Sequence, residues 1–125
     1  MDEAAIRTQV ADTLLRAGAS FGFVFGSRAT GGGPRPDSDL DVAAFWPGPA
    51  PASWEVLLPD GVDLLVLNDA PLEIAGAIAL HGELLFETDP AARVRWVATT
   101  RKIWLDEKPR FERAHREFLE ALRGR

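Results

Sequence analysis

FGFVFGSRATG at residues 21–31 and DSDLDVAAF at residues 37–45 decide the fold of the first half of this chain. The apolar residues of 20–25 predict a short buried strand, which a glycine-serine turn interrupts. A second strand is predicted at 40–45, where a proline-rich segment stops it. These stretches therefore predict two strands joined by a turn and a loop.

The rest of the chain predicts an α+β protein, close to α/β, with a small mixed β-sheet and flanking helices. Val62–Leu67 is a nearly continuous apolar run, which is typical of a central strand. Pro109 predicts that the C-terminal region forms two helices. The predicted helices cover residues 3–18, 72–80, 90–106 and 110–123, with one or two helical turns at 27–31, and the predicted strands cover 20–25, 40–45, 62–67 and, at an edge, 83–86.

Length and composition predict one domain over residues 1–125, with the 46% apolar and 26% charged residues of an ordinary soluble protein. The net charge of −5 argues against direct nucleic-acid binding, which needs a basic surface. No apolar run approaches the roughly 20 residues that span a bilayer, and no export signal is visible. The absence of cysteine fits a reducing compartment, so we expect a cytoplasmic protein with no membrane contact.

Asp39 and Asp41 lie two residues apart at the start of the second predicted strand. Because side chains alternate along a strand, both carboxylates point to one face, while Leu40 and Val42 point to the other. Two carboxylates this close repel each other unless cations lie between them, and hard oxygen ligands suit Mg²⁺. The alternative is an acidic strand end or an aspartate cap on a turn, and the Asp-Leu-Asp pattern alone does not separate the two interpretations.

Asp63 lies inside the apolar run of 62–67, where an unpaired charge is costly to bury. If its strand pairs with that of Asp39 and Asp41, three carboxylates converge at one end of the sheet. Three carboxylates can hold two metal ions, which orient the attacking oxygen and stabilise the leaving oxygen in phosphoryl transfer. Asp63 is also a candidate to accept the proton of the nucleophile. The alternative is a carboxylate in the turn after Gly61.

Gly26 and Ser27 are candidates for phosphate binding. A glycine lets the backbone approach a phosphate closely, and N–H groups at the start of a short helix are natural anion donors. The Ser27 hydroxyl adds a contact for a terminal phosphate oxygen. Arg28 is a further candidate through its charge, with an ordinary surface position as the alternative. A glycine-serine turn alone is common, so the three aspartates give this motif its weight.

Together these residues resemble the signature of the nucleotidyltransferase superfamily of DNA polymerase β: a Gly-Ser turn, a spaced Asp-x-Asp and a third aspartate on a neighbouring strand. GSRA at 26–29, SDLD at 38–41 and VDL at 62–64 look most like its minimal branch, the MNT-domain proteins. The resemblance covers nearly the whole chain. It implies a polymerase-β-type nucleotidyltransferase fold and the transfer of a nucleoside monophosphate to a hydroxyl, with pyrophosphate leaving.

The resemblance also implies what the site residues do. Gly26 and Ser27 would bind the triphosphate of the nucleotide. Asp39 and Asp41 would hold two Mg²⁺ ions, with Asp63 as the third ligand or the general base.

Two features depart from the family pattern. The spacing from Ser27 to Asp39 is one residue longer than usual, and the extra residue falls in the loop at 31–34, which can absorb it at small entropic cost. Thr30 stands where the family often has a basic residue, and Arg35 is a candidate to replace it. Neither departure removes a metal ligand.

Within the minimal branch, the chain resembles the antitoxins of HEPN/MNT toxin–antitoxin pairs. This resemblance implies a protein adenylyltransferase that transfers AMP from ATP to a tyrosine of a HEPN-domain ribonuclease toxin and so silences it. The chain has no tyrosine and cannot be its own tyrosine acceptor. Two alternatives stay open: a small-molecule nucleotidyltransferase of the aminoglycoside type, and an antitoxin that acts by binding, with a catalytically inert site.

The chain has four tryptophans, which is many for its length. Trp46 and Trp54 flank the proline-rich segment, where packing, stacking on an adenine or lining a partner groove are all consistent with their positions. Trp96 and Trp104 lie eight residues apart on roughly one face of a predicted helix and are candidate interface anchors.

Overall fold

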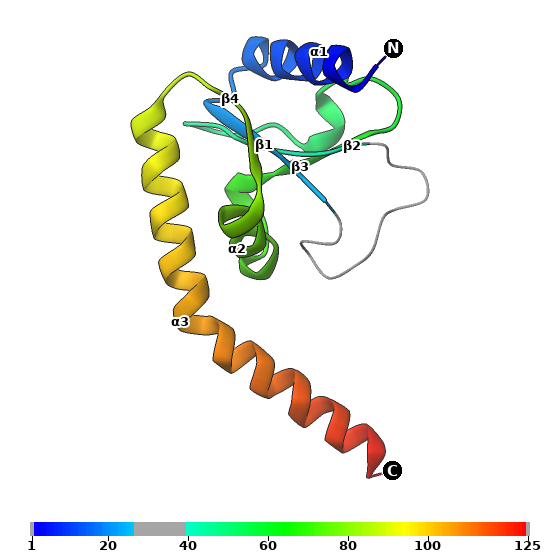
Figure 1. The fold of residues 1–125 in the computed structure, drawn as a ribbon, viewed down its shortest axis with the longest axis vertical. Coiled ribbons are helices and arrows are strands. Elements are labelled where there is room, and N and C mark those ends of the chain that lie inside the picture. Colours follow the sequence, from blue (N-terminus) through cyan, green and yellow to red (C-terminus); the bar gives the residue numbers. More distant parts are fainter. Residues whose placement is uncertain (1, 27–39, 125) are drawn as a thin grey trace.

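The computed structural model describes residues 2–26 and 40–124. Its four strands and its first and second α-helices follow the predicted order, and Figure 1 shows a sheet with α1 over one face and α2 and α3 on the other. The helical turns predicted at 27–31 lie outside the described residues. The elements are α1 (Glu3–Arg16), β1 (Phe21–Phe25), β2 (Leu40–Phe45), η2 (Ser53–Glu55), β3 (Val62–Val66), η3 (Leu67–Asp69), α2 (Leu72–His81), β4 (Glu83–Glu87) and α3 (Pro90–Arg123), with η marking 3₁₀-helical turns.

The four strands form one mixed sheet in the order β3-β2-β1-β4. β1 is antiparallel to both β2 and β4, while β2 and β3 are parallel. The predicted α+β class, the mixed sheet and the edge position of β4 are therefore confirmed. The central position predicted for Val62–Leu67 is wrong, because β3 is the other edge strand of the sheet.

Burial on both faces explains the apolar run of β3. Val62 and Leu64 pack into the cluster on the α1 face of the sheet. Leu65 packs into the cluster on the opposite face. An apolar run therefore reports that both faces of a strand are covered, and it does not report how many strands lie beside it.

Alternation along the strands divides the core between the two faces of the sheet. The α1 face includes Val42 and Ala44 of β2 with Val10 of α1. The opposite face includes Ala43 of β2 with Ile78 of α2. Both faces of the sheet are covered by helices, so a charged residue on a strand near this core is an exception that calls for a chemical reason.

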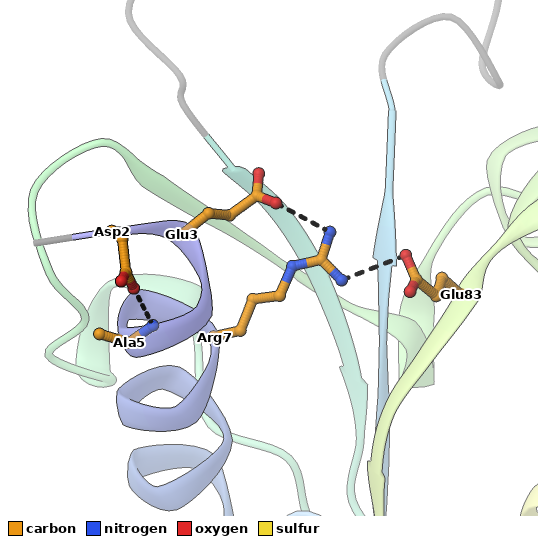
Figure 2. Close-up of polar contacts among 5 residues, drawn as sticks. All are labelled: Asp2, Glu3, Ala5, Arg7 and Glu83. Atoms are coloured by element: carbon orange, nitrogen blue, oxygen red, sulfur yellow. Dashed lines mark hydrogen bonds and ion pairs between the residues drawn. The ribbon is translucent and has the colours of Figure 1, made fainter.

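α1 is fixed at its ends and joined to β4 (Figure 2). The Asp2 side chain accepts a hydrogen bond of 2.8 Å from the amide of Ala5, which caps the first turn. Arg7 Nη1 donates to Glu83 Oε2 at 3.1 Å, and its Nη2 lies 3.5 Å from Glu3 Oε2. Because both carboxylates are exposed, these ion pairs orient α1 on the edge strand more than they stabilise the fold.

α3 is one continuous helix over Pro90–Arg123, so the prediction of two helices separated by Pro109 is wrong. Asp89 caps its start by accepting a hydrogen bond of 3.1 Å from the amide of Ala92. Pro109 has no N–H to donate to the carbonyl four residues earlier, which bends a helix without requiring it to end. Figure 1 shows α3 changing direction in its middle and leading away from the sheet.

Three of the four tryptophans pack within the chain. Trp46 is buried, and its Nε1 donates to the carbonyl of Ala17 at 3.0 Å. The Trp96 ring lies 5.9 Å from the ring of Phe21, and Trp104 is buried against α2. Trp54, by contrast, is 82% exposed. Among the described residues, no helix combines the length and hydrophobicity needed to cross a membrane.

The contact of α2 with α3 depends on the absence of a side chain at Gly76. A Cβ at this position would lie 2.3 Å from Cγ and 2.7 Å from Cβ of Trp104, and side-chain rotation does not move that Cβ. Helix propensity favours alanine over glycine by about 1 kcal/mol, but overpacking costs about 1–3 kcal/mol. Because three atoms of Trp104 would lie within 2.7 Å, the overpacking cost falls at the upper end of this range, so we expect Gly76→Ala to lower the free energy of unfolding by about 2 kcal/mol net in urea titrations.

Gly48→Ala is the matched control, because a Cβ there would meet nothing within 4 Å. This variant should change the free energy of unfolding by less than about 0.5 kcal/mol. A Gly76→Ala protein as stable as the Gly48→Ala protein would contradict close packing of the two helices.

Candidate functional site

The end of β1 and the starts of β2 and β3 lie next to one another at one end of the sheet. Phe25, the last residue of β1, is the register partner of Asp41 in β2. Asp41 is in turn the register partner of Asp63 in β3. Gly26 follows β1 directly and is exposed. The structure therefore brings together Gly26, Asp41 and Asp63, which lie far apart in the sequence.

Asp41 and Asp63 point to the same face of the sheet. Directly paired residues of neighbouring strands share a face, and the strands of a sheet are about 4.8 Å apart. Two residues further along, Ala43 and Leu65 belong to the cluster on the face of α2 and α3. The two half-buried carboxylates thus lie on that face, just beyond the end of its apolar core.

Side-by-side carboxylates give this end of the sheet a concentrated negative charge. At a separation near 5 Å and an effective dielectric near 20, two unit charges repel by about 3 kcal/mol. A divalent cation bound between the oxygens converts this repulsion into attraction. Hard oxygen donors on neighbouring strands suit Mg²⁺, which is bound through one or two carboxylates and completes its shell with water and phosphate. The pair therefore fits the metal that the sequence predicts.

Three predicted site residues, Ser27, Arg28 and Asp39, lie outside the described residues. Within residues 2–26 and 40–124, no group of three or more histidine, cysteine, aspartate or glutamate side chains is arranged to hold a metal ion. The predicted three-carboxylate site therefore stays a prediction, since it includes Asp39. Two of its three members, Asp41 and Asp63, are register partners in neighbouring strands, as the predicted site requires.

A hollow of about 280 Å³ lies beside Asp63 at the outer edge of β3. It is lined by Ser53, Trp54 and Leu57 of the segment that leads from β2 to β3. It is also lined by Val62 and Leu64, which pack on the α1 face of the sheet, so the hollow meets Asp63 at the edge strand and opens mainly on the face opposite to the two carboxylates. The sequence singled out Trp54 but did not indicate its position next to Asp63, and it gave no signal for Ser53 or Leu57. Their position depends on how the proline-rich connection crosses the sheet, which no local pattern encodes.

No protein-family model matches the sequence, and no curated protein matches it. Solved structures do match its fold. A chain of a mutant MntA toxin–antitoxin complex superposes with a TM-score of 0.72 at 15% identity, covering 90% of this chain and 98% of that chain. A chain of a toxin–antitoxin complex with AMP-PNP has a TM-score of 0.60 at 19% identity, covering 87% and 98%.

A third match comes from a complex of a tri-AMPylated HEPN toxin with an MNT antitoxin from Shewanella oneidensis. Its TM-score is 0.61 at 16% identity, and the alignment covers 91% of this chain and 99% of that chain. The fold is therefore the polymerase-β-type nucleotidyltransferase fold that the motifs predict. Within this class, the chain is similar to chains of MNT–HEPN toxin–antitoxin complexes, as the sequence resemblance indicates.

Replacing one of the paired carboxylates should weaken binding of a divalent cation. We expect Asp63→Asn to reduce the affinity for Mn²⁺, a spectroscopic substitute for Mg²⁺, by at least about tenfold, because a ligand of the paired site is lost. Titration of free Mn²⁺ by electron paramagnetic resonance measures this affinity.

Asp69→Asn is the matched control, since Asp69 is an exposed aspartate beyond the opposite end of β3. It removes the same charge from the chain and should leave Mn²⁺ affinity unchanged. Equal affinities for both variants would mean that the Asp41–Asp63 pair holds no metal.

Proposed function

We propose that this protein is an antitoxin with Mg²⁺-dependent nucleotidyltransferase activity, which transfers AMP from ATP to a tyrosine hydroxyl of a HEPN-domain partner toxin. The observation that carries the proposal is the register pairing of Asp41 with Asp63 on one face of the sheet. This pair lies at the end of the sheet where β1 leads into Gly26. We also propose that residues 1–125 act as a single nucleotidyltransferase domain.

The triphosphate would bind at the end of β1. Gly26 allows close approach of the phosphate oxygens to the backbone. Ser27 and Arg28 follow it in the sequence and would supply a hydroxyl and a positive charge. Bound in this way, the α-phosphorus would come next to the start of β2, where Asp41 lies.

Asp39, Asp41 and Asp63 are the residues that would hold the metal. Two Mg²⁺ ions bound there would neutralise the phosphate charge and stabilise the entering and leaving oxygens of an in-line displacement. The carboxylate pair keeps its place through the ladder between β2 and β3, so the protein needs no rearrangement to present it.

Asp63 is positioned to serve the acceptor. It belongs to the edge strand and lines the hollow that Trp54 also lines. In the proposed step the acceptor oxygen forms a bond to the α-phosphorus of ATP, and the bond from that phosphorus to the bridging oxygen of pyrophosphate breaks. The proton of the acceptor hydroxyl passes to the Asp63 carboxylate, and pyrophosphate carries away the electron pair of the broken bond.

Similar structures support ATP as the nucleotide and a HEPN-domain toxin as the partner. One matching structure contains AMP-PNP, and another contains a tri-AMPylated HEPN toxin with an MNT antitoxin. The absence of tyrosine from this chain is consistent with an acceptor on another protein. A small-molecule acceptor and inhibition by binding alone are the outcomes that would replace this proposal.

The activity is tested by incubating the protein with Mg²⁺, each α-labelled nucleoside triphosphate in turn, and the protein encoded by the neighbouring reading frame. We expect label from ATP on the partner, with Asp41→Asn lowering the rate by at least about 100-fold, because transition-state charge stabilisation of this kind is worth about 10²–10³ in rate. Asp69→Asn should retain the wild-type rate, since Asp69 lies beyond the other end of β3.

Each remaining outcome names a different function. Label confined to small molecules would indicate a small-molecule nucleotidyltransferase. A stable complex without any transfer, unchanged by Asp41→Asn, would indicate an antitoxin that acts by binding.

Trp54 should affect binding of the acceptor and not binding of the nucleotide, because it lines the hollow at Asp63. We expect Trp54→Ala to raise the KM for the acceptor protein about 3–10-fold, the loss of one aromatic contact of about 0.5–1.5 kcal/mol. The KM for ATP should not change, and Trp54→Phe should recover most of the loss. An increase in the KM for ATP instead would assign the tryptophan to the nucleobase.

A further inference from the structure

The distal half of α3 carries an apolar face that the rest of the described chain does not cover. Every residue from 108 to 124 is exposed, although α3 is helical throughout this segment. Large apolar side chains are exposed with the rest, Phe118 at 60% and Leu122 at 48%. Figure 1 shows this half of the helix leading away from the sheet.

The exposed apolar side chains lie on one side of the helix. Phe111, Phe118, Leu119 and Leu122 are 40–60% exposed, and at about 100° per residue they cover an arc of about 100°. Charged residues such as Arg113 and Glu117 fall on the opposite side. We call the four apolar residues the distal face of α3.

The distal face continues an interface that already exists within the chain. Trp104, seven residues before Phe111, is buried against Gly76 of α2. The Trp104 and Phe111 rings are 5.4 Å apart, so the apolar side of α3 passes without a break from the core to the exposed segment. A helical segment of this length is marginal in water by itself, which indicates that the distal face packs against another molecule.

The charge of the distal half of α3 and the width of its apolar arc indicate which kind of molecule packs against it. Residues 108–124 carry five basic and three acidic side chains, and a net charge of +2 with both signs interspersed is weaker than the basic patch that binding to a nucleic acid or an acidic membrane needs. An arc of about 100° is wider than the seam of a two-stranded coiled coil and matches a helix that packs into a core. A single helix from a second copy of this chain would leave part of the arc uncovered, whereas a groove between helices would cover it.

The direction of α3 brings its occupant to the site's side of the sheet. α2 and α3 cover the face on which Asp41 and Asp63 lie. In Figure 1 the distal half of α3 passes below α2 and turns toward the side on which β1 ends. A protein bound to the distal half of α3 therefore lies beyond the face of the sheet that α2 and α3 cover, which is the face that carries the two carboxylates.

We infer that the distal face of α3 is the docking surface for the acceptor protein, and that it inserts into an apolar groove between helices of that protein. This inference rests on the proposed function, because it assigns the surface to the substrate of that reaction. Docking holds the acceptor near Asp41 and Asp63, so the small hollow at Asp63 does not have to supply the affinity.

The test uses the full chain and, as the candidate acceptor, the protein encoded by the neighbouring reading frame. Phe118→Ser/Leu122→Ser removes two apolar side chains of the distal face, and Arg113→Ser/Glu117→Ser removes two charges from the opposite side. Neither pair alters the net charge, and all four residues are exposed, so circular dichroism should show both variants folded. Calorimetry measures the dissociation constant of the complex, and sedimentation measures the mass of each chain alone.

We expect the Phe118/Leu122 pair to weaken the complex at least about 100-fold, as loss of two interface anchors does, and the Arg113/Glu117 pair to change it less than about threefold. At saturating acceptor, the rate of AMP transfer should be the same for both pairs. Equal affinity of the two pairs would overturn the inference. A wild-type dimer that the Phe118/Leu122 pair converts to monomer would also overturn it, because a second copy would be the occupant.

The same measurements separate this inference from the proposed function. AMP transfer with equal acceptor KM in both pairs would leave the function standing and remove the docking surface. Loss of binding in the Phe118/Leu122 pair, without AMP transfer by the wild-type protein, would leave the docking surface standing and remove the function.

Discussion

The parallel pairing of β2 with β3 is the constraint on which the rest of this structure depends. It aligns Asp41 with Asp63, so two carboxylates face the same side at a distance set by the strand spacing. Parallel neighbours cannot be joined by a tight hairpin and need a crossover. The crossover here runs from Trp46 to Gly61, and its residues Val56 and Leu58 pack on the α1 face of the sheet. The same pairing thus creates the carboxylate pair and brings Trp54 to the edge strand beside it.

Because helices cover both faces of the sheet, the two carboxylates are exceptions on strands that are otherwise apolar. The strands can be apolar on both sides because α1 packs on one face and α2 with α3 on the other. Against this background, an aspartate on each of two paired strands places two carboxylates side by side, an arrangement that suits a bound cation. Both lie at the end of the sheet where β1 terminates, so the charge is concentrated beyond the core and does not disrupt it.

Much of this could be predicted from the sequence, and the failures have physical causes. Strand patterns are local, so all four strands followed from residue patterns. The shared face of Asp41 and Asp63 depends on the pairing of β2 with β3, which the sequence supplied only as a condition. The edge position of β3 could not be predicted in this way, because an apolar run indicates that both faces of a strand are buried and says nothing about how many strands lie beside it. Pro109 removes one hydrogen bond, which the remaining bonds of α3 tolerate, so a bend replaced the predicted break. The hollow at Asp63 depends on the path of a long connection, which is set by tertiary contacts. The roles of Ser27, Arg28 and Asp39 in the site stay predictions, because these residues lie outside the described part of the chain.

A chain of 125 residues has little room for a catalytic site that also binds a protein substrate tightly, and a separate docking surface would remove this difficulty. The hollow beside Asp63 is about 280 Å³, which is at the lower limit of small-molecule sites and offers little area for binding a protein substrate. A docking surface elsewhere converts the encounter of the acceptor hydroxyl with the site into a step within one complex, and effective concentrations in such complexes reach the millimolar range. α3 can provide this because its first half is fixed against the sheet through Trp96 and Trp104 while its second half stays outside the core. If the acceptor docks in this way, the bend at Pro109 would set the direction from which it meets the carboxylates.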